Sequence, residues 1–382
     1  MKIVINALQY RSDGSGIAVN LRELFGRFTM ISKRRCQIIL PQKSPAFPCS
    51  SATECIEAPC TYDEGFKRIW YQSFELGRRN CTDTVLLTID SKIPLLLPKS
   101  CMVVPLITDL AVFRMPEAYQ RSRVLLWRLQ YRYLCRRADR FLAISEFTKQ
   151  EMTAILGIAP EQIDVIPCAA PEGIRRVKDR NTLTALRVKY KLPEHYVLFV
   201  GNFNPRKNLR RLMEAFDLVK QETNLPHELV IAGGQGWRFD AAEALKSVAA
   251  KDAVHFIGYV PDEDMPALYS TAELFVFPTL YEGFGIPVIE AQRCGTPVLT
   301  SNVSALPEVG GDGAAYVDPY DVKDIAQGMK ELLQNEEWKQ NLIERGSINA
   351  ERFSWEASAG KLNEIVEGLI EEWTSTGATA CG

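Results

Sequence analysis

Short runs of apolar residues recur along the whole chain, and longer segments with helical spacing separate them. Nearly every position in these runs is apolar, which is typical of parallel strands that are buried on both faces. The segments between them repeat apolar residues every three or four positions, as at 208–222 and 322–334. This alternation predicts doubly wound α/β structure. The runs are 2–7, 36–41, 83–90, 101–109, 140–145 and 163–169 in the first half, and 196–202, 228–234, 254–260, 273–278, 296–301 and 314–319 in the second.

Both halves carry the same alternation, and 382 residues exceed what one hydrophobic core usually supports. We therefore expect two Rossmann-like domains, an N-terminal one over 1–175 and a C-terminal one over 176–359. The amphipathic segment 353–373 predicts one or two helices, and we expect 360–382 to pack back on the N-terminal domain. Ligands of such sheets bind at the carboxyl ends of the strands, so two facing domains would form a cleft between those ends.

Glycine and basic residues follow the first strand of each half. Gly14, Ser15 and Gly16 precede a helical pattern, where free backbone amides would attract an anion, although an ordinary turn has the same composition. Arg206 and Lys207 follow the run that ends near Gly201, at the start of a helical segment. Cations oppose the helix dipole there unless an anion is present, so the pair predicts a diphosphate clamp; a solvated basic turn is the alternative.

The stretch TLYEGFGIPVIEA (279–291) follows another strand and places two acids around a glycine turn. Backbone amides of Gly283, Phe284, Gly285 and Ile286 would face a ligand at the start of the next helix, because glycine lets the main chain approach closely. Glu282 would accept hydrogen bonds from sugar hydroxyls. Glu290, two turns further on, would accept two from a ribose. This pattern predicts a nucleotide-sugar site.

The chain as a whole resembles the retaining glycosyltransferases of family 4, which have the GT-B fold. The resemblance rests on EGFGIPVIE with its two glutamates separated by seven residues, together with DGSGIAVN, ITDLAVFRMPEAY, LAISEFTKQEM, VGNFNPRKNLRRLMEAF and RFSWEASA. It is strongest to bacterial O-antigen mannosyltransferases that use GDP-mannose. The resemblance implies a hexosyltransferase that adds a sugar to a polyprenyl-diphosphate-linked saccharide in lipopolysaccharide synthesis.

The resemblance also implies a role for each candidate residue. Arg206 and Lys207 would hold the donor diphosphate, and Glu282 would lie beside the donor sugar. Glu290 would bind the ribose, and Gly201 would lie at the donor. The main chain of Tyr259 and Val260 would touch the base, and Gly14 to Gly16 would lie by the phosphates and the acceptor.

One position departs from the family pattern. The family commonly has His-Asp where this chain has Thr108 and Asp109. Threonine keeps a hydroxyl and loses the imidazole, which puts the contact to the donor sugar in doubt. We expect Asp109 in the site, with a turn or helix-capping acid as the alternative.

No metal or cofactor is expected. The resemblance implies that the departing phosphate takes the acceptor's proton on the same face of the sugar, and cations would stabilise the leaving group. Asp262, Glu263 and Asp264 spell a metal motif of other glycosyltransferases, but they precede a helix, so we interpret them as N-terminal capping residues. His195, His227 and His255 are isolated in the sequence, and this argues against a histidine-rich zinc site.

Charge is distributed unevenly: residues 1–170 carry a net charge of about +7, and the remainder about −9. The stretch 121–140 interleaves seven arginines with aromatic residues and leucines, which predicts a helix on an anionic membrane surface or a core-facing helix with a solvated arginine side. Without an export signal or a membrane span, and with ten cysteines at irregular spacing, we expect reduced thiols and a cytoplasmic protein peripheral to the inner membrane. No nucleic-acid motif accompanies the basic patch.

Three other functions share parts of this pattern. Another GT-B enzyme with a UDP-sugar, such as a glucosyl- or GlcNAc-transferase or an epimerase, would have the same fold. A degenerate, non-catalytic glycosyltransferase serving as a scaffold would explain Thr108, but not the preserved Arg206, Lys207, Glu282 and Glu290. An NAD-dependent oxidoreductase would need a glycine spacing that Gly233, Gly234 and Gly236 do not provide.

Overall fold

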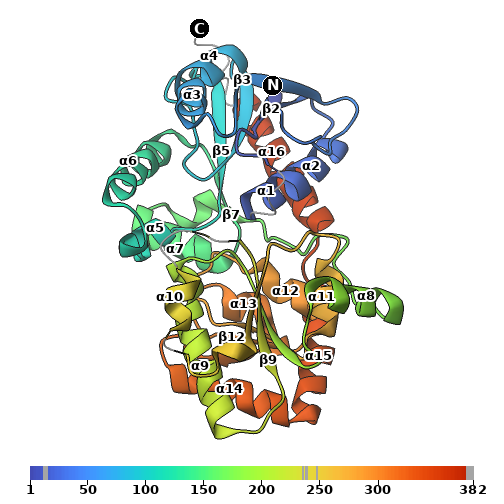
Figure 1. Cartoon of the computed structure of the whole chain (residues 1–382). Coiled ribbons are helices and arrows are strands. Elements are labelled where there is room, and N and C mark those ends of the chain that lie inside the picture. The colour runs from blue at the N-terminus through green and yellow to red at the C-terminus, as the bar shows by residue number, and fades with distance from the viewer. Residues whose placement is uncertain (12–15, 235, 237–239, 247, 376–382) are drawn as a thin grey trace. The chain divides into compact units, whose positions relative to one another are not determined.

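Two separate parallel sheets, each covered by helices, organise the chain (Figure 1). The computed structural model describes residues 1–11, 16–234, 236, 240–246 and 248–375. The strands are β1 (Lys2–Asn6), β2 (Cys36–Gln42), β3 (Glu54–Thr61), β4 (Thr84–Ile89), β5 (Cys101–Ile107), β6 (Phe141–Ala143), β7 (Ile163–Val165), β8 (Tyr196–Val200), β9 (Glu228–Ala232), β10 (Val254–Gly258), β11 (Leu274–Phe277), β12 (Val298–Ser301) and β13 (Ala315–Val317).

Helices connect these strands. They are α1 (Gly16–Asn20), η1 (Leu21–Phe25), α2 (Gly26–Ile31), α3 (Gly65–Trp70), η2 (Tyr71–Glu75), α4 (Leu76–Asn80), α5 (Ala111–Arg114), η3 (Pro116–Ala118), α6 (Arg121–Arg137), α7 (Glu146–Leu156), η4 (Pro160–Gln162), α8 (Arg180–Tyr190), η5 (Pro205–Lys207), α9 (Leu209–Glu222), α10 (Ala241–Leu245), η6 (Lys251–Ala253), α11 (Met265–Thr271), α12 (Ile286–Arg293), α13 (Leu306–Gly310), η7 (Gly311–Gly313), α14 (Val322–Gln334), α15 (Glu336–Ala350) and α16 (Trp355–Ser375).

The first sheet has the order β3-β2-β1-β4-β5-β6-β7. Its strands lie where the apolar runs predicted them, with one exception: β3 was not predicted. This edge strand exposes Glu54 and Glu57 and contains Pro59, so it lacks the continuous apolar run of a central strand.

The second sheet has the order β10-β9-β8-β11-β12-β13. Each predicted run of the second half forms one of its strands, and β8 and β11 are apolar throughout, as expected for strands covered on both faces. Because β8 pairs with β9 on one side and β11 on the other, the strand order reverses beside β8. Ligands of doubly wound sheets bind at such a reversal.

Contacts between residues divide the chain into two units, Met1–Cys168 with Ser354–Gly382, and Ala169–Phe353. The boundaries expected from the sequence were 175 and 359. Within the described residues, no helix combines the length and the apolar character needed to cross a membrane.

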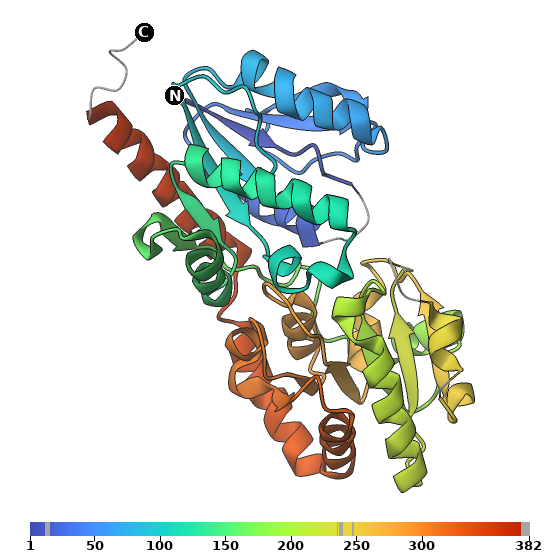
Figure 2. The same ribbon diagram turned by 90° about the vertical axis from the view of Figure 1, so that its left-hand side faces the viewer.

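The C-terminal segment forms one helix, α16, which runs along the N-terminal unit (Figure 2). It packs beside α2, from which it is separated by more than 300 residues of sequence. Arg34 donates three charge-assisted hydrogen bonds to Glu367, two from Nε at 3.1 Å and one from Nη2 at 2.7 Å. Leu362, Val366 and Ile370 form the buried side of α16.

Replacing Leu362 by alanine tests this packing. Leu362 has no exposed surface, so the loss of its side chain is expected to lower the free energy of unfolding by about 2–4 kcal/mol. Urea unfolding followed by circular dichroism measures the change. Glu364→Ala, on the exposed side of α16, is the control and is expected to change stability by less than about 0.5 kcal/mol. Equal effects of the two substitutions would contradict the docking of α16.

Candidate functional site

Asparagine side chains shape the loop that carries the two predicted cations. The Asn204 side chain accepts from the amide of Arg206 at 3.1 Å and so starts the short helix η5. Asn208 adopts a left-handed conformation. Its side-chain amide donates to the carbonyls of Pro278 at 2.9 Å and Pro319 at 2.7 Å. Asn208 therefore ties the loop after β8 to the segment after β11. The two neighbouring strands thus present their carboxyl ends as one surface.

Arg206, Lys207 and Glu282 meet at this surface in a buried ion cluster. Arg206 Nη1 lies 3.1 Å from Glu282 Oε2, and Lys207 Nζ lies 2.8 Å from Glu282 Oε1. Arg206 Nη1 also donates to the carbonyl of Tyr281 at 2.9 Å. Burial acts against ionisation, but Arg206 and Lys207 outweigh it and hold the pKa of Glu282 below its ordinary value. Two cations thus share the carboxylate of Glu282.

The glycine turn beside Glu282 requires its glycine. Gly285 has φ +110° and precedes α12, and a Cβ there would come within 2.7 Å of Leu306 Cδ2. The Phe284 ring packs edge-to-face on Phe353 with centroids 5.3 Å apart, so its side chain belongs to the core. The backbone amides of residues 283–286, rather than their side chains, suit a ligand, because the first amides of a helix have no partner within that helix.

Glu290 lies in the second half of α12 and accepts a hydrogen bond of 2.8 Å from the Tyr269 hydroxyl. Burial, with a smaller contribution from Asp262, raises the pKa of Glu290 to about 7. Donor hydroxyls of a ribose would favour the ionised form. Asp262 belongs to the loop after β10, which also contains the exposed Tyr259 and the buried Val260.

The acids of this loop do not all act as predicted. Asp264 precedes α11, but its side chain does not cap that helix. Instead its carboxylate accepts from Lys189 Nζ and from the Tyr190 hydroxyl, both at 2.6 Å. The capping prediction is therefore wrong for Asp264, because a cation and a phenol from α8 compete successfully for its carboxylate.

The N-terminal unit brings together Asp90 and the Thr108-Asp109 pair. Asp90 Oδ1 accepts from the amide and the hydroxyl of Thr108, at 2.9 and 2.8 Å. Asp109 Oδ1 accepts from the amide of Ala111 at 3.0 Å, so this acid shapes the turn into α5. Gly16 begins α1 and is exposed, whereas Gly14 and Ser15 lie outside the described residues.

Asp90 was not predicted as a site residue. Burial raises the pKa of Asp90 to about 6, Asp109 adds to the shift, and the hydrogen bonds from Thr108 oppose it. The signal was available in the sequence, since Asp90 ends the run 83–90 just as Asp109 ends the run 101–109. Both acids thus lie at the carboxyl ends of the neighbouring strands β4 and β5.

Two histidines that are far apart in the sequence lie close together in space. His195 and His227 lie with ring centroids 5.7 Å apart, and both contact Glu273. They lie at the amino ends of their strands, away from the carboxyl ends that carry Arg206 and Glu282.

Comparison with known proteins assigns the family. Residues 108–172 match the family described as Glycosyltransferase Family 4, and residues 185–348 match Glycosyl transferases group 1. Together these matches cover more than half of the chain. The chain belongs to the family 4 glycosyltransferases.

Two relatives of this glycosyltransferase come from Escherichia coli. It is 35% identical to O-antigen chain mannosyltransferase B over 250 residues, which are 65% of each chain. It is 32% identical to the serotype-specific mannosyltransferase WbdA over 252 residues, 64% of this chain and 30% of that one. The matched segment therefore spans slightly less than two thirds of the first relative and less than one third of the second.

Solved structures confirm the predicted GT-B fold. Sucrose-phosphate synthase from Thermosynechococcus elongatus has a TM-score of 0.74 at 20% identity, over 97% of this chain and 100% of that one. WaaG, a glycosyltransferase involved in lipopolysaccharide biosynthesis, has a TM-score of 0.73 at 17% identity, over 96% of this chain and 100% of that one. These identities bear on the fold of the glycosyltransferase alone.

Replacing Asp90 by asparagine is expected to stabilise the protein in a pH-dependent manner. The raised pKa means that the folded state holds the Asp90 proton more tightly than the unfolded state, so this acid costs stability as pH rises from about 4 to about 6. The substituted asparagine side chain would keep an acceptor for Thr108. We expect Asp90→Asn to add about 1–3 kcal/mol at pH 8 and little near pH 4. Urea unfolding at several pH values measures this, with the exposed Asp63→Asn as control; a gain independent of pH would contradict it.

Proposed function

We propose that this protein is a retaining mannosyltransferase that transfers mannose from GDP-mannose to a polyprenyl-diphosphate-linked saccharide during O-antigen synthesis. The names of both Escherichia coli relatives support mannose, and the name of the first supports the O-antigen. The proposal rests most on one observation, the buried cluster of Arg206, Lys207 and Glu282 at the carboxyl ends of β8 and β11.

The cluster suits a donor diphosphate for electrostatic reasons. The side chains of Arg206 and Lys207 are only 16% and 12% exposed, so an anion would be shielded from water beside them. Low local dielectric strengthens such charge pairs. The arginine fork and the lysine point charge bind phosphate oxygens in complementary ways. The amides at the start of α12, aligned with the helix dipole, would add further donors.

The proposed reaction needs no side-chain base at the anomeric carbon. The acceptor hydroxyl attacks that carbon from the face that the diphosphate leaves, and the bond between the carbon and the phosphate oxygen breaks. The departing phosphate oxygen takes the acceptor's proton. Arg206 and Lys207 stabilise the charge that builds on the leaving diphosphate, so no metal is assigned to this step.

Glu290 would bind the nucleotide through its ribose. Its pKa of about 7 leaves it partly protonated at neutral pH, and two ribose hydroxyls would favour the carboxylate. Nucleotide binding would then release a fraction of a proton from Glu290. Gly201, Tyr259 and Val260 are the remaining residues that we propose to contact the nucleotide-sugar donor. Asp109 and Asp90 belong to the N-terminal unit, which we propose to bind the acceptor.

We further propose that the protein binds the cytoplasmic face of the inner membrane, where the lipid-linked acceptor would lie. Helix α6 buries Val124, Tyr131 and Leu134 and exposes three leucines among its arginines. Leu125 is 62% exposed, Leu126 50% and Leu129 57%. An apolar strip flanked by cations suits the interface of an anionic bilayer.

A nucleotide panel tests the donor. We expect GDP and GDP-mannose to raise the melting temperature, since a ligand at a hundredfold excess over its Kd stabilises the folded state by about 2.7 kcal/mol. Shifts with UDP-glucose or UDP-GlcNAc alone would overturn the mannose donor and favour a UDP-sugar enzyme. No shift with any nucleotide would favour a non-catalytic scaffold.

Arg206→Ala tests the clamp in the same assay and in mannosyl transfer. Loss of one charge-stabilising donor is expected to lower kcat about 100-fold or more. Arg206→Lys keeps the positive charge but lacks the forked guanidinium. It serves as the test variant if Arg206→Ala folds poorly. The control is Arg210→Ala, on the exposed side of α9. Full activity of both Arg206 variants would contradict the clamp.

Vesicle flotation tests the membrane contact. We expect the protein to float with vesicles rich in phosphatidylglycerol and to stay unbound with phosphatidylcholine alone. Leu125→Ser combined with Leu129→Ser should weaken flotation by about tenfold or more, since each buried apolar side chain contributes about 1.5–3 kcal/mol. Val188→Ser, at an apolar residue of α8 that is even more exposed, should have no effect. Unchanged flotation of the double variant would contradict a role for α6.

A further inference from the structure

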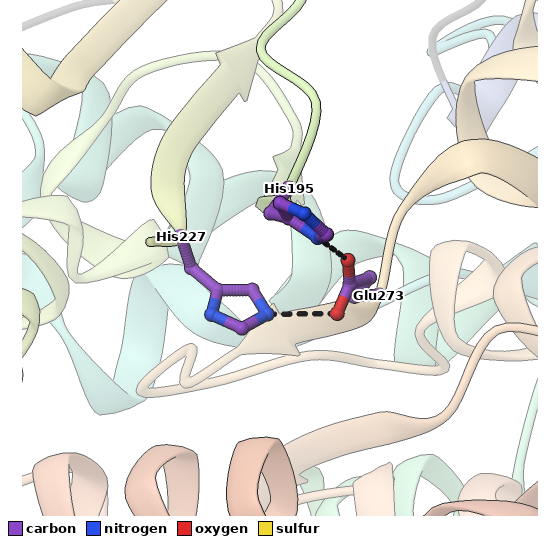
Figure 3. Close-up of side chains that lie close together, drawn as sticks. All are labelled: His195, His227 and Glu273. Atoms are coloured by element: carbon purple, nitrogen blue, oxygen red, sulfur yellow. Dashed lines mark hydrogen bonds and ion pairs between the residues drawn. The ribbon is translucent and has the colours of Figure 1, made fainter. Parts of the chain in front are cut away.

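Three side chains with metal-binding chemistry meet at the amino edge of the second sheet (Figure 3). His195, His227 and Glu273 immediately precede β8, β9 and β11. These strands are neighbours in the order β9-β8-β11. The three residues are therefore distant in sequence but adjacent at one edge.

Backbone hydrogen bonds place these residues in register. The amide of Glu228 donates to the carbonyl of His195 at 3.0 Å, and the amide of Glu273 donates to the carbonyl of Tyr196 at 3.0 Å. Arg187 fixes the segment before His195 by donating to the carbonyls of Pro193 and Glu194. The strand ladder thus extends to the residues that carry the side chains.

The side chains converge on the Glu273 carboxylate. Oε1 contacts His195 Nδ1, and Oε2 lies 2.8 Å from His227 Nε2. One ligand atom from each residue lies within 4.8 Å of the other two.

We propose that His195, His227 and Glu273 bind a Zn²⁺ ion. Two imidazoles and a carboxylate are ligands that zinc accepts at about 2.0–2.2 Å, whereas Mg²⁺ and Ca²⁺ prefer oxygen ligands. Bonds of that length need the two imidazoles to move slightly away from the carboxylate they now contact. The side chains of His195 and Glu273 are 42% and 31% exposed, so a water molecule can reach the fourth position.

The site has a feature that limits its affinity. His227 is 5% exposed, and its Nδ1 has no hydrogen-bond partner in the described part of the chain. A metal on Nε2 requires the imidazole proton on Nδ1, where it lacks an acceptor. Metal affinity typically falls about 10–100-fold when a metal-ligating histidine has no hydrogen-bond acceptor for its other ring nitrogen. We therefore expect a moderate rather than a tight zinc site.

Zinc at this edge would act on stability and not on transfer chemistry. It would join the starts of three adjacent strands, whereas Arg206 and Glu282 lie beyond the opposite ends of β8 and β11. The inference therefore does not depend on the proposed function.

The chain provides a matched control at the same edge. His255 Nε2 contacts Glu228 Oε2, a pair formed by β10 and β9. One imidazole and one carboxylate offer too few ligands for a structural zinc site. This pair resembles the candidate site in composition and exposure, but we do not expect it to bind zinc.

Zinc binding to the full chain, purified without a polyhistidine tag and stripped with EDTA, tests the proposal. Competition with a chromophoric zinc indicator measures affinity and stoichiometry, and the melting temperature is measured with ZnCl₂ and with MgCl₂. We expect one zinc equivalent to be lost in His195→Ala and in Glu273→Gln, with affinity at this site reduced about tenfold or more. His255→Ala should bind as the parent does.

Two further readouts make the result decisive. Cys49 and Cys55 have thiols 3.7 Å apart and can bind zinc, but this background is the same in every variant. A zinc-dependent rise in melting temperature should occur in the parent and in His255→Ala and should be absent from His195→Ala. Equal zinc stoichiometry in the parent, His195→Ala and Glu273→Gln would overturn the site, as would equal losses in His255→Ala.

Discussion

One buried carboxylate, Glu282, positions two cations at the point where the strand order of the second sheet reverses. A cation pair this close would repel itself in a buried setting, so Arg206 and Lys207 can stay there only with an anion between them. Glu282 supplies that anion when no ligand is bound. The asparagines of the β8 loop and the left-handed glycine before α12 then fix the backbone around the cluster. Most of the candidate site follows from this electrostatic requirement.

The charges of the cluster also affect how Glu282 would respond to a bound diphosphate. A diphosphate would compete with it for Arg206 and Lys207, and the two anions would repel each other if both kept full contact with the cations. Donor binding would therefore free one or both oxygens of Glu282, at the place where the sugar hydroxyls would lie. Each carboxylate oxygen can accept more than one hydrogen bond, so even partial release from the cations would let Glu282 accept from sugar hydroxyls, the role expected from the sequence.

The sequence predicted those features that follow from continuous apolar runs. Twelve strands, the two-unit α/β organisation and the placement of Arg206, Lys207 and Glu282 beyond neighbouring strands all follow from runs buried on both faces. Strand β3 escaped prediction because an edge strand with Glu54, Glu57 and Pro59 has no such run.

Side-chain partners were harder to predict than strands. Asp264 pairs with Lys189 and Tyr190 from another helix, and no local pattern indicates that choice. His195, His227 and Glu273 meet because of the order of β9, β8 and β11, which a list of strands does not contain. Asp90 could have been found, because it ends its strand in the same way as the acid that was recognised.

The edge-to-face pair of Phe284 and Phe353 has a mechanical consequence. Phe284 lies inside the glycine turn, and Phe353 is the last residue of the second unit before the chain returns to the first. Arg293, at the end of α12, holds the carbonyl of Phe353 at 3.1 Å. Both ends of α12 are thus attached to the segment through which the chain leaves this unit. A shift of the glycine turn would therefore require the Phe284–Phe353 ring contact to move or break, at the residue where the chain leaves this unit.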